Sequence, residues 1–203
     1  LRLPDHMIHT SRVKPAMKWI RSFFKHRGTS LSRTYHTNWM RVKKQLLNIS
    51  MDASPWGMGA VRYDRNWKAV DYWYDSITPA DCAHLNATAG IPDYMTLWEA
   101  LVLSISLRTW AHDAIGMTFA VRSDNAGVGT IVGKLRSSNP SLNLISCEIA
   151  LDMTKQMYDP IRIAHIPGTS NVVPDFLSRI HQPTASRVQL NWPSELKHAK
   201  RIN

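Results

Sequence analysis

The segment from residue 46 to residue 60 reads LLNISMDASPWGMGA and joins a mainly apolar run, an acidic residue and a tight turn. The apolar run ends at Asp52. The Ser-Pro-Trp-Gly sequence that follows at residues 54–57 is typical of a turn, because serine, proline and glycine each favour turn positions. Apolar residues then resume toward residue 63. The segment therefore predicts two antiparallel strands, 46–52 and 59–63, with an acid at the end of the first.

The pattern on either side of this segment predicts a mixed sheet. A third strand is expected over residues 68–74, and the polar connection over 75–95 is too long for a simple turn. The remaining predicted elements are a helix over 97–111, a strand over 117–123, helices over 125–135 and 140–158, a strand over 161–166 and a helix over 172–180. This order predicts an α/β fold with a five-stranded sheet, in which three antiparallel strands come first and two parallel strands follow helical crossovers.

Four acids occupy the positions where such a sheet carries its chemistry. Asp52 and Asp124 each end an apolar run, Glu99 lies one turn into a helix, and Asp175 begins the final helix. Active sites in α/β sheets lie beyond the carboxyl ends of the strands. Hard cations require oxygen ligands, and two ions about 3.5–4 Å apart support phosphodiester hydrolysis. The set predicts a site for two Mg²⁺ ions, with Mn²⁺ as the alternative metal.

Each acid also has a purely structural explanation. Glu99 follows Thr96 by three residues, which is the pattern of a capping box. Asp175 lies where an acid favours a helix through the helix dipole, Asp124 precedes a helix that it could cap, and Asp52 precedes a turn. Singly, each acid is weak evidence. Their order and setting together indicate a metal site.

The net charge of +10 is confined to the beginning of the chain. Residues 1–50 contain eleven Lys or Arg and one acid, whereas residues 51–203 contain fourteen of each sign. Basic side chains that neutralise phosphates release counterions, so this segment predicts binding to nucleic acid; a solvated charged helix face is the alternative. The basic residues expected to contact nucleic acid are Arg12, Lys14, Lys18, Arg21, Lys25, Arg27, Arg41, Lys43 and Lys44.

Composition limits the remaining possibilities. The chain has 203 residues, of which 44% are hydrophobic, so it can bury a core, and no apolar stretch approaches the ~20 residues of a membrane span. The two cysteines, Cys82 and Cys147, are far apart, which predicts a reducing intracellular compartment without a disulfide framework. The first residue is Leu1 rather than Met, as expected of a processed product or a fragment of a longer chain.

Four blocks of the sequence resemble a known family. They are MDASPWGMGA at 51–60, LWEAL at 97–101, VRSDN at 121–125 and AHIPGTSNVVPDFLSR at 164–179. Together they resemble the ribonuclease H domains of retroelement polyproteins, above all those of DIRS-like reverse transcriptases. The resemblance covers residues 46–181, and its most specific block is the last. It implies a ribonuclease H-like fold in which Asp52, Glu99, Asp124 and Asp175 match the four metal-binding acids of the family.

The resemblance also assigns the rest of the chain. His165 matches a loop histidine that assists release of product or metal, although a strand-end histidine bonded to the backbone explains it equally well. Residues 1–45 resemble the basic, largely helical connection that follows a polymerase, with a helix over 31–47, and residues 182–203 form a C-terminal tail. The helix after Asp124 contains Gly127, Gly129 and Gly133, so we expect it to be irregular.

The first functional hypothesis is a metal-dependent endonuclease that cuts the RNA strand of RNA/DNA hybrids. Asn125 and Asn171 are candidates for polar contacts to the hybrid, and Arg122, Lys134 and Arg136 for phosphate contacts. All five are equally explained as surface or capping residues. A retroelement enzyme of this kind would act in the cytoplasm or nucleus.

The second hypothesis is a domesticated ribonuclease H-like domain that binds RNA as a structural subunit of a large ribonucleoprotein, such as a mitochondrial ribosome. The basic N-terminal segment and the absence of polymerase motifs favour it, whereas the four acids do not. A domain recruited recently could keep its acids without using them. This hypothesis places the protein in the mitochondrion and needs no catalysis.

Overall fold

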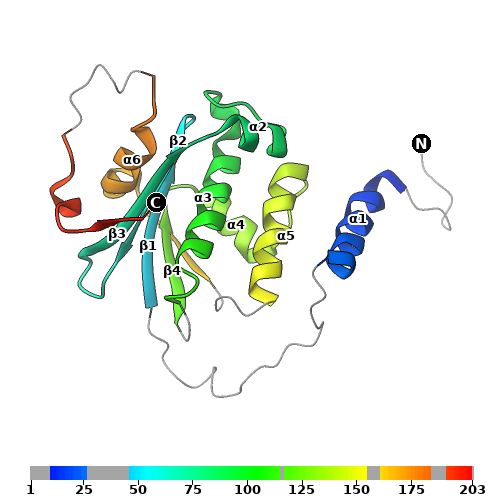
Figure 1. Ribbon diagram of the computed structural model, residues 1–203, viewed down its shortest axis with the longest axis horizontal. Helices are drawn as coiled ribbons and strands as arrows, with labels where there is room; N and C mark the ends of the chain where they lie inside the picture. The colour runs from blue at the N-terminus through cyan, green and yellow to red at the C-terminus, as the bar shows by residue number, and fades with distance from the viewer. Residues whose placement is uncertain (1–9, 27–45, 115–116, 155–160, 184–190, 203) are drawn as a thin grey trace. The chain divides into compact units, whose positions relative to one another are not determined.

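The computed structural model describes residues 10–26, 46–114, 117–154, 161–183 and 191–202. The chain divides into two units, residues 1–40 and residues 41–203. The first contains one described helix, α1 (Thr10–His26), and the second contains a sheet covered by helices (Figure 1). None of the helices in these described ranges is both long and apolar enough to cross a bilayer.

Helix α1 carries part of the predicted basic segment. The side chains of Lys14, Lys18, Arg21 and Lys25 are exposed on it. The predicted helix over 31–47 lies outside the described residues. So do the side chain of Arg12 and the residues Arg27, Arg41, Lys43 and Lys44.

The sheet of the second unit has the predicted mixed topology, which is confirmed. Its strands are β1 (Leu46–Ala53), β2 (Gly57–Tyr63), β3 (Ala69–Ser76), β4 (Thr118–Ser123), β5 (Arg162–His165) and β6 (Lys200–Arg201). Strands β1, β2 and β3 pair antiparallel, whereas β4 runs parallel to β1 and β5 runs parallel to β4. The spatial order is β5-β4-β1-β2-β3-β6, so β1 is central and its carboxyl end adjoins that of β4.

The turn between β1 and β2 is held by the serine that the sequence places there. The hydroxyl oxygen of Ser54 accepts hydrogen bonds from the backbone N–H groups of Trp56 and Gly57, at 3.2 and 3.0 Å. The hydroxyl itself donates to the carbonyl oxygen of Ser178 at 2.7 Å. The turn is therefore tied to a residue more than 120 positions away, and it fixes the end of β1.

One face of the sheet packs against a helical layer that forms the main core (Figure 1). The layer consists of α2 (Pro79–Leu85), α3 (Met95–Thr109), α4 (Ala126–Lys134) and α5 (Pro140–Thr154). Helix α3 is buried along most of its length, and Arg108 ties it to α5 through ion pairs with Glu148 and Asp152 at 2.8 and 2.5 Å. Helix α4 runs without a break from Ala126 to Lys134, so the predicted irregularity is wrong. Gly127 serves close packing, because a methyl group there would meet the Thr96 side chain at 2.9 Å.

The connection over residues 75–95 contains α2, which the sequence reading missed. The helix begins with a capping box, in which the Thr78 hydroxyl accepts from the backbone N–H of Asp81 and the Asp81 carboxylate accepts from the backbone N–H of Thr78. The capping box therefore lies at Thr78 and not at Thr96, where we had considered it. Helix α3 begins after Tyr94 without a side-chain cap.

The opposite face carries α6 (Val172–Arg179), which rests on glycines of β2. A methyl group at Gly57 would lie 2.6 Å from the carbonyl oxygen of Ser178, and one at Gly59 would lie 3.0 Å from the Ser178 amide nitrogen and overlap Leu177. Only residues without a Cβ let the helix backbone come this close to the strand.

The described part of the C-terminal tail, residues 191–202, packs on the sheet domain. The side chain of Leu196 is 2% exposed and packs with Val61, Tyr72 and Leu177 in a second core under α6. Residues 200–201 add β6 to the edge of β3, so the part of the sheet that the structure describes has six strands instead of the predicted five. A two-residue strand is too short to produce a periodic pattern in the sequence.

We expect Gly59→Ala to lower the free energy of unfolding by about 2 kcal/mol, because the added methyl group forces α6 away from β2. Gly133→Ala is the matched control, since nothing lies within 4 Å of a methyl group at that position in α4, and it should stabilise the protein by up to about 1 kcal/mol. Urea unfolding of both variants measures the difference. Equal effects of the two substitutions would contradict the close packing of α6.

Candidate metal-binding site

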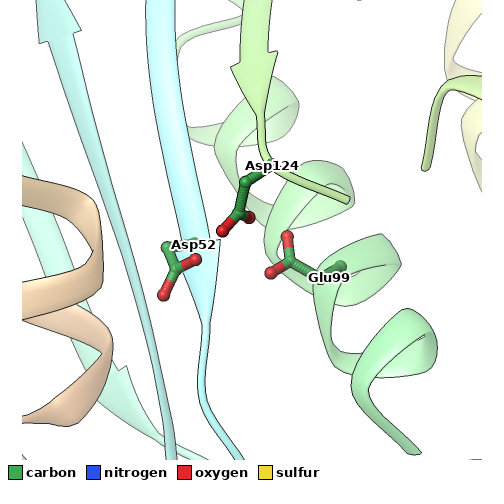
Figure 2. Close-up of side chains that lie close together, drawn as sticks. All are labelled: Asp52, Glu99 and Asp124. Atoms are coloured by element: carbon green, nitrogen blue, oxygen red, sulfur yellow. The ribbon is translucent and has the colours of Figure 1, made fainter. Parts of the chain in front are cut away.

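Three acidic side chains converge at the carboxyl-terminal edge of the sheet. Asp52 lies near the end of β1, Asp124 directly follows β4, and Glu99 projects from the second turn of α3 (Figure 2). Each offers a carboxylate oxygen, and these oxygens lie within 4.8 Å of one another. The structure thus brings together three of the four acids selected from the sequence.

Asp52 is buried, with 4% of its surface exposed, and is held from the α6 side. The hydroxyl of Ser178 donates to its Oδ2 at 2.6 Å, and Asn171 Nδ2 approaches its Oδ1 at 3.5 Å. Burial raises the pKa of Asp52 to about 7, and the Asp124 and Asp175 carboxylates also raise it, while the hydrogen bond from Ser178 acts in the opposite direction. Near neutral pH this carboxyl group is poised between its two protonation states.

Glu99 is buried more deeply, with 2% of its surface exposed. Its Oε1 accepts a hydrogen bond from the backbone N–H of Ala53 at 3.0 Å, and Ser123 Oγ lies 3.5 Å from Oε2. Burial is the main cause that raises the pKa of Glu99 well above its ordinary value, and the Asp52 carboxylate adds to it. Because both adjacent acids have raised pKa values, a positive charge bound between them would favour their ionised forms.

Asp124 is the most exposed of the three, and it does not cap the following helix. That role belongs to Asn125, whose Oδ1 accepts from the backbone N–H of Gly127 at 2.8 Å. Gly168 faces the Asp124 carboxylate so closely that a methyl group on it would lie 3.2 Å from Oδ2. Helix capping therefore does not explain Asp124, and its carboxylate projects toward the other two acids (Figure 2).

No protein-family model matches the chain, and no curated protein matches it in sequence. Solved structures do resemble it. RNase H1 from the halophilic archaeon Halobacterium salinarum aligns with a TM-score of 0.52 and 19% identity, over 68% of this chain and 97% of that one. The chain has a ribonuclease H-like fold. The N-terminal RNase H domain of a Mycobacterium tuberculosis protein aligns with a TM-score of 0.50 and 16% identity, over 70% of this chain and 97% of that one.

The fourth predicted acid of this ribonuclease H-like domain, Asp175, stands apart from the other three. It lies in the first turn of α6, and its carboxylate accepts from Arg179 Nε at 2.6 Å. It is nevertheless near enough to Asp52 for its charge to raise the pKa of that residue. Its side chain is 42% exposed, and its role as a metal ligand stays a prediction.

The remaining predicted residues occupy different environments. His165 ends β5, and its Nε2 bonds to the backbone carbonyl of Asp124 at 2.9 Å. Asn171 is 1% exposed and donates to the carbonyl of Met51 at 2.9 Å, so it joins the start of α6 to β1. Lys134 and Arg136 line a surface hollow of about 510 Å³.

Sequence reasoning missed Ser178. Its hydroxyl reaches the carboxylate of Asp52 although 126 positions separate the two residues. The available signal was a small polar residue on the apolar face of a short amphipathic helix, directly beside Leu177. The hydroxyl of a serine on the apolar face of a helix is buried, so it needs a hydrogen-bond acceptor inside the protein.

We expect Asp52→Asn to stabilise the metal-free protein at pH 8 and to have little effect at pH 4. The folded wild-type protein binds the Asp52 proton more tightly than the unfolded chain does, so its stability falls as the pH rises from about 4 to about 7. Asparagine carries no charge to bury, and thermal unfolding in EDTA should show a midpoint higher by about 5 °C at pH 8.

The exposed acid Asp93 provides the control, and Asp93→Asn should leave the midpoint unchanged at both pH values. Added Mg²⁺ should raise the midpoint of the wild type and not that of Asp52→Asn. Identical midpoints of wild type and Asp52→Asn at pH 8 would show that Asp52 is not buried as a charge.

Proposed function

We propose that this protein is a divalent-metal-dependent endonuclease that hydrolyses the RNA strand of RNA/DNA hybrids. The observation that carries the proposal is the convergence of Asp52, Glu99 and Asp124, two of them buried, at the carboxyl-terminal edge of a ribonuclease H-like sheet. The motif blocks of retroelement ribonuclease H domains support the finer assignment to that type of enzyme. Asp175 is proposed as the fourth acid of the site.

The donor set fits Mg²⁺ or Mn²⁺. Carboxylate oxygens are the ligands that hard cations prefer. Among the described residues, no basic side chain forms an ion pair with any of the three acids, although the charge of Arg179 acts on Asp52 from its own pair with Asp175. Burying carboxylates without a positive partner is costly, and a divalent cation would offset that cost. Bound there, divalent cations supply the positive charge that stabilises the phosphate and the leaving oxygen during hydrolysis.

The protein's own groups prepare the site for that charge. The backbone N–H of Ala53 fixes Glu99, and the hydroxyl of Ser178 fixes Asp52, so both carboxylates are held without the aid of a ligand. Since the pKa of Asp52 is about 7, metal binding displaces a proton, and the affinity for Mg²⁺ should rise with pH through that value. Lys134 and Arg136 in their hollow, and Asn125 at the start of α4, are proposed to hold the hybrid backbone.

The wild-type protein should cleave the RNA strand of a 5′-labelled hybrid in the presence of Mg²⁺. Asp52→Asn, Glu99→Gln and Asp124→Asn should each reduce the rate more than about 100-fold while retaining binding to the hybrid in EDTA. Single-stranded RNA and duplex DNA of the same sequence serve as control substrates. A folded wild-type protein that binds the hybrid and leaves it intact would refute the enzymatic proposal.

Loss of the Ser178 hydroxyl should have a smaller effect than loss of a ligand. Ser178→Ala should weaken the affinity for Mg²⁺ by about 10-fold, measured by calorimetry, because Asp52 loses the group that orients it. Ser146→Ala is a matched control, since Ser146 is also fully buried in a helix and donates only to the carbonyl of Leu142. Equal Mg²⁺ affinities of the two variants would leave Ser178 with no part in positioning Asp52.

A structural role in a ribonucleoprotein is the second candidate, and the exposed lysines and arginine of α1 favour it. It predicts that the protein co-sediments with a ribosome-sized particle and that deletion of residues 1–45 releases it. The enzymatic proposal predicts that the same deletion weakens binding and leaves the acidic site intact. The structural role would place the protein in the mitochondrion, and the enzymatic role would place it in the cytoplasm or nucleus.

A further inference from the structure

The hairpin between β2 and β3 holds a tryptophan in a backbone conformation that favours glycine. Trp67 has a φ of 60°, in the left-handed region. The turn is otherwise well bonded: the Asp64 N–H donates to the Lys68 carbonyl at 2.9 Å, and Asp64 Oδ1 accepts from the N–H groups of Asn66 and Lys68. A bulky side chain at such a position costs about 1 kcal/mol or more, and strain of this kind clusters at functional sites.

The indole ring of Trp67 makes a specific contact with a cation. The guanidinium carbon of Arg122, on β4, lies 3.3 Å from the ring centroid, and the ring of Tyr63 lies 5.6 Å away by centroids. Trp67 is still 41% exposed. Among the described residues, no carboxylate forms an ion pair with Arg122, so its stacked guanidinium keeps its N–H groups for another partner.

A second unpaired cation lies on the same face of the sheet. Arg162 on β5 pairs in register with Ala120, and Ala164 pairs with Arg122, so the side chains of Arg162, Ala164 and Arg122 share one face. Arg162 and Ala164 are exposed, and no described acid forms an ion pair with Arg162. We call Trp67, Arg122, Arg162 and Ala164 the Trp67 surface.

The Trp67 surface lies on the side of the sheet that carries α6 and not on the side of the helical layer. Arg122 pairs with Ser50, two residues before Asp52 on the face that α6 covers, while α6 itself packs on β1, β2 and β3 (Figure 1). Arg122 also precedes Asp124 by two residues, which is roughly 7 Å along a strand. Tyr63 beside the hairpin pairs with Asn48, and Arg162 pairs with Ala120, so Trp67 and Arg162 lie toward the start of β1 and β4. Arg122 is the member of the surface that comes nearest to the acidic edge, and the surface is separate from the hollow lined by Lys134 and Arg136.

We propose that the Trp67 surface binds single-stranded nucleic acid, with an unpaired base against the exposed part of the Trp67 ring and phosphates on Arg122 and Arg162. Aromatic rings stack on bases of any sequence, and arginines pair with phosphates, so the two together match a single strand. An acidic peptide would use the cations and leave the ring without a role. A duplex would hide its bases from the ring. The strand bound here leads toward Asp124, and this last point rests on the proposed function.

The test measures binding of a fluorescein-labelled 15-nucleotide oligo(U) to the full chain in EDTA, by fluorescence anisotropy. Trp67→Gly should weaken binding about 10-fold, while its thermal midpoint stays equal to or above that of the wild type, because glycine relieves the backbone strain. Arg122→Gln should weaken binding similarly. Arg65→Gln is the control, since it removes an exposed charge from the same hairpin without touching the stacked pair.

An affinity of Trp67→Gly that is equal to that of the wild type, or reduced no more than that of Arg65→Gln, would overturn the proposal. Photocrosslinking of the wild type to an oligonucleotide carrying 5-iodouridine gives an independent result: crosslinks in the peptide around Trp67 support the proposal, and crosslinks confined to residues 1–45 overturn it. Single-strand binding that depends on Trp67, without cleavage of a hybrid, would refute the proposed enzyme and leave this surface standing.

Discussion

The acidic site depends on the hydrogen bond that the Ser178 hydroxyl donates to the Asp52 carboxylate. It joins α6 to β1, and it exists because Gly57 and Gly59 of β2 let the helix backbone lie against the sheet. The Ser54 hydroxyl closes the same junction by donating to the Ser178 carbonyl. A side chain at either glycine would lift α6 and leave a buried carboxylate without its donor, which is more costly than losing the bond between two exposed groups.

The same junction buries two carboxyl groups, and their ionisation costs free energy. Raising the pKa of Asp52 from 3.8 to about 7 corresponds to roughly 4 kcal/mol that opposes its ionisation, and Glu99 lies beside it in an even more buried position. If positions 52 and 99 only filled the protein interior, apolar residues would be more stable there. A pair of acids held by Ala53 and Ser178 and facing Asp124 has a physical explanation if a divalent cation shares the site.

The order of strands and helices was predictable because hydrophobic periodicity and turn residues are local signals. The positions of Asp52 and Asp124 at strand ends followed directly from that order, since parallel strands bring their carboxyl ends to one edge of the sheet. Helix α2 was missed although the Thr-Pro-Ala-Asp sequence at 78–81 is a capping box, because only a long polar connection was predicted over residues 75–95. Strand β6 was missed because two residues carry no period.

The rest was not predictable from local sequence, because the decisive partners lie far apart along the chain. Nothing near Ser178 reveals that it reaches Asp52, and nothing near Arg122 reveals that it stacks on Trp67. Asn171 and Arg122 are both predicted to contact the hybrid, but Asn171 is buried as a tie to β1, whereas Arg122 stacks on a tryptophan and stays a candidate for phosphate contact. Burial and long-range contact separate these roles, and only the folded chain contains that information.

The most direct test of the account is the anomalous scattering of Mn²⁺ in crystals of the protein soaked at pH 8, above the pKa of Asp52. The account predicts an anomalous peak at about 2.1 Å from carboxylate oxygens of Asp52, Glu99 and Asp124. Ordered carboxylates with no peak between them, or peaks found only elsewhere on the protein, would contradict it.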